Sequence, residues 1–275
     1  MLDWKAKDIF HAYLAELHET GKAISLSQEA RTSILKYLNW TSLKLDNDAN
    51  RLVLDALKAI PNIKTPVVAR AIFVCVHAGF EQFIRDLLEA AATTISESKL
   101  LRNTMGSANK EILEKLYGHQ IKLAGEGFRR YFDPLAHLRI DYAKVANAVV
   151  QSSQSDKPFL LDGTVFGIRV GNINREAIDS SFERFGCKIS WSGFAENPVL
   201  QGILKTSGKR NTEKAVTIFL NEILVKRNQI AHTQGSLVLS MEQLEQQIKF
   251  LIELSTFLHQ TLSISISNLL PKKQK

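Results

Sequence analysis

The sequence predicts a mostly α-helical protein, because three stretches repeat apolar residues every three or four positions. These stretches are residues 66–95, residues 211–232, and a last one from about Ser240 to Leu262. Each is long enough to form a helix with a wide apolar stripe, and such a stripe is buried from water by packing against a neighbouring element. With 275 residues, of which 45% are hydrophobic, the chain can bury a substantial core between such helices.

An N-terminal segment, residues 1–64, is expected to hold three shorter helices ahead of a main domain. Four apolar side chains fall near one face of a helix over residues 3–18, and Gly21 is expected to end it. A second helix is expected to start near Ser27, and a third to cover residues 47–59.

The main domain, residues 65–265, begins with a helix that has separate apolar and polar faces. Its apolar stripe consists of Val68, Ile72, Val76, Phe80, Phe83 and Leu87. At 100° per residue, Arg70, His77 and Glu81 lie within about 40° of one another on the opposite side. This second face fits a solvated helix surface as well as one wall of an active cleft.

Between the core helices, residues of about 100–210 are expected to form a mixed insertion. Residues 107–150 have helical spacing, with breaks predicted near Gly125 and at the next proline. Residues 159–170 combine β-branched residues with glycines, which fits either one or two short strands or an irregular excursion. A short helix is expected over residues 174–186.

The charge distribution points to a polyanionic partner. The formal net charge is +7, and residues 201–275 alone carry ten basic and five acidic side chains. Part of this excess lies in a basic tail, residues 266–275. Such a segment is typical of proteins that bind nucleic acid, and also fits a soluble protein whose tail happens to be basic.

Several absences predict a cytoplasmic protein without membrane contact. Two cysteines far apart, Cys75 and Cys187, make no disulfide framework, so a reducing compartment is expected. No continuous apolar run reaches the 18 or more residues of a membrane span, and the first residues lack the pattern of a signal peptide.

The segment from Val225 to His232 carries the candidate chemistry. Taking Val216 as the centre of its helical stripe, Arg227 falls about 20° away, at a position where the pattern places an apolar residue. A charge there must pair, extend to water or face another subunit. His232 falls about 160° from Val216, so the two side chains share no face of one ideal helix. They can meet if the helix frays, or if two copies meet across a dimer interface.

Arginine and histidine together suffice to cleave RNA. A histidine near its ordinary pKa can accept the proton of a ribose 2′-hydroxyl or protonate the 5′-oxygen that leaves. A guanidinium can hold the scissile phosphate and stabilise charge on its oxygens. Asn228 can position either the phosphate or the imidazole, and no metal is needed because the 2′-hydroxyl is an internal nucleophile. A structural arginine near a surface histidine fits the same residues.

Two motifs resemble the HEPN superfamily of helical ribonuclease domains, in particular its RiboL-PSP-like branch. The first is Arg227-Asn228 followed by His232 at the end of a helix, then a polar turn and a last amphipathic helix. It departs mildly from the family pattern, because two residues separate the histidine from Gly235. The second is the aromatic-Glu pair Phe80-Glu81 in the early core helix.

The resemblance implies a HEPN-type helical bundle and a metal-independent endoribonuclease without a cofactor. It also implies a homodimer that acts on RNA as a toxin or phage-defence effector, restrained by an antitoxin or another regulatory partner protein. By position, Arg227 and His232 would be catalytic, and Asn228 and Glu81 would position the substrate. The candidate RNA contacts are Lys226, Arg70 and His77. The alternative is a non-catalytic HEPN scaffold that binds RNA, a nucleotide or a partner protein.

Overall fold

In a computed structural model, the protein is described at residues 5–41, 65–101, 106–131, 141–167, 173–232 and 239–270. Within these residues the regular elements are all helices, accompanied by one isolated β-bridge between Leu101 and Pro158. The prediction of a mostly α-helical protein is therefore confirmed. The helix expected over residues 47–59 lies outside the described residues.

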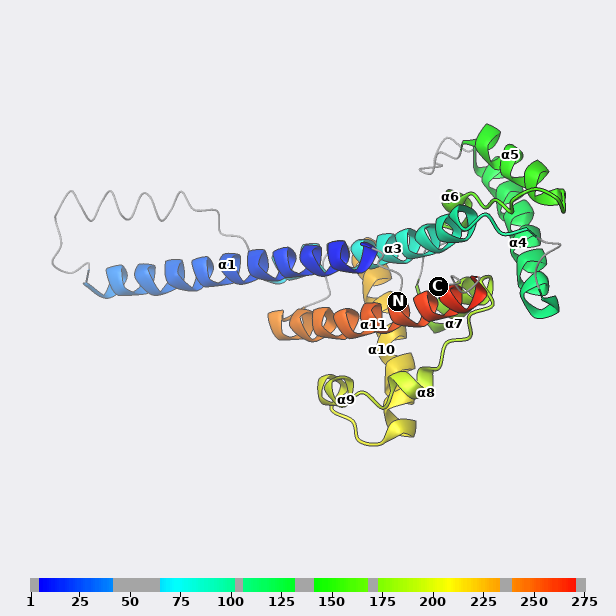
Figure 1. The fold of residues 1–275 in the computed structure, drawn as a ribbon. Coiled ribbons are helices and arrows are strands. Elements are labelled where there is room, and N and C mark those ends of the chain that lie inside the picture. The colour runs from blue at the N-terminus through cyan, green and yellow to red at the C-terminus, as the bar shows by residue number, and fades with distance from the viewer. Residues whose placement is uncertain are drawn as a thin grey trace.

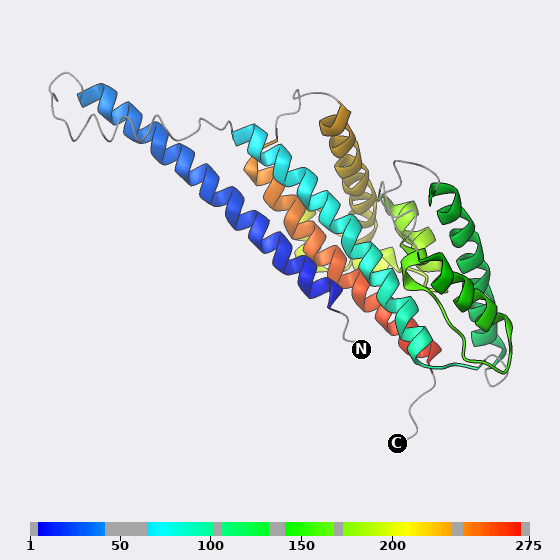
Figure 2. The same ribbon diagram turned by 90° about the horizontal axis from the view of Figure 1, so that it is seen from above.

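Three long helices form the centre of the molecule: α1 (Ala6–Thr41), α3 (Thr65–Glu97) and α11 (Met241–Leu269). They lie side by side, with α1 antiparallel to α3 and α11, and the C-terminal end of α1 extends beyond the first turns of the other two (Figure 2). A fourth long helix, α10 (Lys209–His232), packs against α3 and crosses the three at a steep angle (Figure 1).

Aromatic side chains hold α1 on α3. Phe10 is buried between Phe80 and Phe83, with ring centroids 5.8 and 5.2 Å away. His11 Nε2 lies 2.8 Å from the Ser255 hydroxyl and so joins the same helix to α11. The N-terminal segment thus packs directly onto the main domain through its first helix.

The prediction that Gly21 ends the first helix is wrong, because α1 continues through it to Thr41. A Cβ atom at Gly21 would come within 2.8 Å of Ile72 and 2.9 Å of Met241. The missing side chain of this glycine therefore allows α1 to pack closely against α3 and α11, and the chain does not turn here.

The regular elements in the described residues of the insertion are helices, so its mixed character is smaller than expected. Its helices are α4 (Ser107–Tyr131), α5 (Tyr142–Ser153), α6 (Gly163–Phe166), α7 (Arg175–Glu183), α8 (Trp191–Phe194) and α9 (Pro198–Leu204). The predicted break near Gly125 is wrong, because α4 passes through it. Of the two options for residues 159–170, the irregular path is found over 159–162, before α6.

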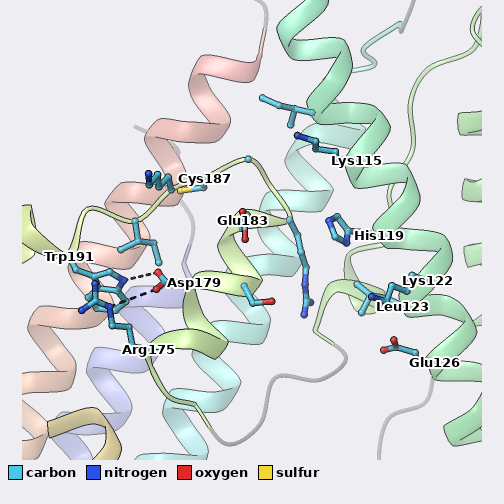
Figure 3. Close-up of a pocket in the computed structure, with 16 residues that line it drawn as sticks. Lys115, His119, Lys122, Leu123, Glu126, Arg175, Asp179, Glu183, Cys187 and Trp191 are labelled. Carbon is cyan, nitrogen blue, oxygen red and sulfur yellow. Dashed lines mark hydrogen bonds and ion pairs between the residues drawn. The ribbon is translucent and has the colours of Figure 1, made fainter. Parts of the chain in front are cut away.

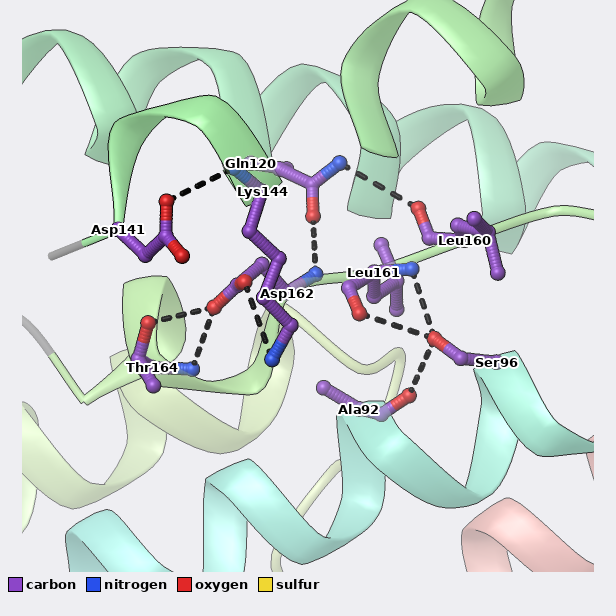
Figure 4. Close-up of polar contacts among 9 residues, drawn as sticks. All are labelled: Ala92, Ser96, Gln120, Asp141, Lys144, Leu160, Leu161, Asp162 and Thr164. Atoms are coloured by element: carbon purple, nitrogen blue, oxygen red, sulfur yellow. Dashed lines mark hydrogen bonds and ion pairs between the residues drawn. The ribbon is translucent and has the colours of Figure 1, made fainter. Parts of the chain in front are cut away.

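Polar side chains of α3 and α4 form hydrogen bonds with the backbone of the irregular segment 159–162 (Figure 4). The Ser96 hydroxyl accepts a hydrogen bond from the Leu161 N–H at 2.7 Å and lies 3.0 Å from the Leu161 carbonyl. The Gln120 amide accepts from the Asp162 N–H at 2.6 Å and donates to the Leu160 carbonyl at 3.4 Å. These side chains replace the partners that strands would supply to the same backbone groups.

Helix α3 is also long and apolar enough, by length and composition, to cross a membrane over residues 67–97. The core helix of a soluble protein passes the same test, and half of its most apolar 18-residue window is buried in the fold. The absence of membrane contact stays a prediction.

Candidate active site

Helix α10 carries the Arg–Asn…His motif in its last turns. Val216, Leu220 and Ile223 on one face are buried. Val225 is 54% exposed, and Arg227 follows it by about 200°, on the opposite side of the helix. The helix continues to His232, whose side chain lies outside the described part of the chain.

Arg227 is half-buried where α10 packs against α3. Its Nη1 atom donates a hydrogen bond to Asn228 Oδ1 at 3.1 Å, which orients the guanidinium along the helix surface. Arg227 also lies close enough to His77 on α3 to lower the pKa of that imidazole. The charge on the apolar stripe therefore reaches toward the polar face of α3.

Three side chains on α3, those of His77, Glu81 and Arg85, form a row on the side of Arg227. We call these three residues, together with Arg227 and Asn228, the α3–α10 cluster. His77 Nδ1 lies 3.5 Å from Glu81 Oε1, and Arg85 Nη2 lies 3.8 Å from Glu81 Oε2. The spacing of four residues places successive members one above the other on the helix. Glu81 thus bridges a histidine and an arginine.

Burial decides the ionisation of His77, whose side chain is only 3% exposed. Desolvation lowers its pKa below the usual 6.5, the negative charge of Glu81 raises it, and the positive charge of Arg227 lowers it further. The imidazole is therefore neutral at pH 7. Its Nε2 atom is buried and has no hydrogen-bond partner among the described residues.

The structure changes the interpretation of several predicted site residues. His77 was expected on a solvated or cleft-lining face, but the crossing of α10 buries it, so it is not an exposed RNA contact. Glu81 was expected to position the substrate; its carboxylate contacts the His77 imidazole, whose pKa the nearby Arg227 lowers. Lys226 lies 3.8 Å from Glu222, and Arg70 is half-buried on α3.

Arg85 belongs to the cluster, although the motifs did not single it out. The signal was present in the sequence, because a glutamate four residues before an arginine is the favoured order for an ion pair along a helix. The cluster links two guanidinium groups, one carboxylate and one neutral imidazole along the polar face of α3. Such a set can bind a phosphate and hold its arginines in place.

Comparison with known proteins identifies the family. The RiboL-PSP-HEPN family matches residues 41–263, which is most of the chain. This protein therefore belongs to the RiboL-PSP-HEPN family, a HEPN-type domain. No curated protein and no solved structure matches the chain.

Proposed function

We propose that this protein is a metal-independent endoribonuclease in which Arg227 and His232 act on the scissile phosphate of RNA. The ribose 2′-oxygen forms a bond to phosphorus while the bond to the 5′-oxygen breaks. His232 accepts the 2′-hydroxyl proton or protonates the leaving oxygen, and Arg227 stabilises the charge on the phosphate. The products carry a 2′,3′-cyclic phosphate and a 5′-hydroxyl.

The observation that carries this proposal is the placement of Arg227. A guanidinium stands where an apolar residue would pack better, and it is held there by Asn228 beside the His77–Glu81 pair. A charge kept at such a cost indicates a role other than stability. Membership of the family supports an RNA-related function for the chain.

We further propose that the active unit is a homodimer. Positions 227 and 232 are separated by about 140° on an ideal helix, so we do not expect one protomer to present both side chains to a single phosphate. A dimer in which two copies of the end of α10 meet would complete the site. Light scattering at micromolar concentration tests this, and a protein that is only monomeric would contradict it.

The biological role that we propose is that of a cytoplasmic toxin or phage-defence effector, restrained by an antitoxin or regulatory partner. Induced expression should then arrest cell growth, and the His232→Ala variant should not. Growth arrest by both proteins at equal abundance would contradict the toxin role.

The decisive experiment compares RNA cleavage in EDTA by the wild type, His232→Ala, Arg227→Ala and the control Arg210→Ala. Loss of proton transfer should slow His232→Ala by roughly 10²–10⁴-fold. Arg227→Ala should lose cleavage and also bind RNA more weakly, because it loses a phosphate contact. Arg210 is exposed on the same helix, so its replacement should leave cleavage unchanged.

Folding must be followed in parallel by thermal unfolding, because Arg227 lies in a packed contact. Folded variants that cut RNA at the wild-type rate would contradict the enzymatic proposal. They would favour a non-catalytic HEPN scaffold that binds RNA, a nucleotide or a partner protein.

A further inference from the structure

A second site lies away from the α3–α10 cluster, in a cleft between α4 and α7 (Figure 3). The cleft has a volume of about 920 Å³, and it continues along the segment that follows α7 as far as Trp191. None of Arg227, Asn228, His77 and Glu81 lines it. Its volume falls within the usual range for a small-molecule site, about 300–1,000 Å³.

Basic side chains from two parts of the chain line this cleft. Lys115, His119 and Lys122 are four and three residues apart, so they form a ladder on one face of α4 (Figure 3). Arg184 and Lys188 come from the end of α7 and the segment after it.

Two lysines of this set form no ion pair with the described residues. Lys122 and Lys188 are exposed, and no carboxylate in the described part of the chain lies within ion-pair distance of either. By contrast, Lys115 is paired with Glu111 at 2.8 Å, and Arg184 donates to the Phe166 carbonyl at 3.3 Å. The cleft lining therefore includes two ammonium groups without a described ion pair, those of Lys122 and Lys188. It also includes the guanidinium of Arg184, which the Phe166 carbonyl holds in place.

The positive groups lie close enough to affect one another. Burial lowers the pKa of His119 most, and the charges of Arg184 and Lys122 lower it further, against the opposing charge of Glu183. Five lysine and arginine side chains and three carboxylates line the cleft, so its net positive charge favours an anionic ligand.

The rest of the lining favours a ligand with donor groups besides its anion. Glu183 and Glu126 provide carboxylates in the same cleft. Cys187 also lines it, and burial raises the pKa of its thiol to about 11, so it stays protonated and is no nucleophile at pH 7. A nucleotide unit has both kinds of group, since its phosphate is anionic while its ribose and base can donate hydrogen bonds.

We propose that the α4–α7 cleft binds a nucleotide unit, with Lys122, Lys188 and Arg184 as the cationic contacts of the ligand. The unit belongs either to a free nucleotide or to an RNA strand, because the two share this chemistry. The proposal is independent of RNA cleavage, since the cleft shares no residue with the α3–α10 cluster.

The test compares a cleft variant, Lys122→Gln with Lys188→Gln, with a control variant, Lys110→Gln with Lys157→Gln. All four lysines are exposed, and the control pair lies outside the cleft. The probes are ATP and a fluorescent 2′-O-methyl RNA 12-mer, which lacks the attacking hydroxyl. The cleft variant should bind at least one probe about tenfold more weakly than the control variant, because it loses charged hydrogen bonds to phosphate.

Weaker binding of the 12-mer alone would identify an RNA strand, and weaker binding of ATP would identify a free nucleotide. Lysine acetylation read by mass spectrometry adds a local measurement on the wild type, where the bound probe should protect Lys122 and Lys188 but not Lys110 and Lys157. Equal affinities of the two variants for both probes, with equal acetylation in the presence and absence of probe, would overturn the proposal. Because both variants retain Arg227 and His232, this outcome is distinct from a failure of RNA cleavage.

Discussion

At the junction of the insertion with α3 and α4, the oxygen and the nitrogen of the Gln120 side-chain amide are both hydrogen-bonded. The Ser96 hydroxyl is hydrogen-bonded to the N–H and the carbonyl of Leu161. At the α3–α10 cluster, a neutral imidazole with a buried, unpartnered Nε2 lies beside the positive charge of Arg227. Both places bury polar groups between helices. The first is held by hydrogen bonds from side chains to the backbone, which is typical of a structural joint. The second keeps a buried nitrogen without a described partner beside a positive charge, which is typical of a functional site.

The largest effect on stability is expected from Ser96→Ala at the structural joint. It leaves the N–H and carbonyl of Leu161 without their described partner, and each buried unpaired group costs about 1–3 kcal/mol. The free energy of unfolding should fall by about 2–4 kcal/mol in urea titrations. Ser153→Ala, at an exposed serine of α5, is the matched control and should change it little. Equal effects of both changes would show that the joint is not a structural element.

Arg227→Leu should change the free energy of unfolding in the opposite direction. It replaces a half-buried charge on an apolar stripe by an apolar side chain, so the free energy of unfolding should rise by about 1 kcal/mol. Arg175→Leu is the control, because Arg175 bonds Glu213 and Thr217, each at 2.9 Å, and should lower the free energy of unfolding when replaced. A loss of stability at Arg227 as large as at Arg175 would make Arg227 structural.

The smallest effect concerns the pH dependence of stability. The folded-state pKa of His77 lies below its unfolded value of 6.5, so the unfolded chain binds more protons as the pH falls below 6.5. Stability is therefore present above that pH and is lost as the pH falls toward the folded-state pKa. His77→Gln should flatten this decline, leaving the part due to His11 and His119, whose pKa values burial also lowers. An unchanged slope in unfolding measurements between pH 7 and 5 would contradict the account of His77.

The sequence was a good guide to helices and a poor guide to their ends. Apolar spacing predicted the long core helices, and the expected helix start at Ser240 is confirmed by a capping box with Gln243. Glycine was misleading at Gly21 and Gly125, because both lie inside helices. Whether a glycine ends a helix or admits a neighbour depends on contacts that are distant in sequence.

The same limit applies to the candidate site. The conflict between Arg227 and its apolar stripe was visible from helical spacing alone. The burial of His77 was not, because it results from the crossing of α10 over α3, which no local pattern specifies. The α4–α7 cleft was also missed, since its basic groups are scattered along the insertion and meet only in the fold.

The most direct test of the central claim is end-group analysis of RNA cut by the purified protein in EDTA. Attack by the 2′-hydroxyl predicts fragments with a 2′,3′-cyclic phosphate and a 5′-hydroxyl, and it predicts that a 2′-O-methyl substrate stays intact. Fragments with a 3′-hydroxyl and a 5′-phosphate, cleavage of the 2′-O-methyl substrate, or no cleavage by the folded wild type would contradict the claim.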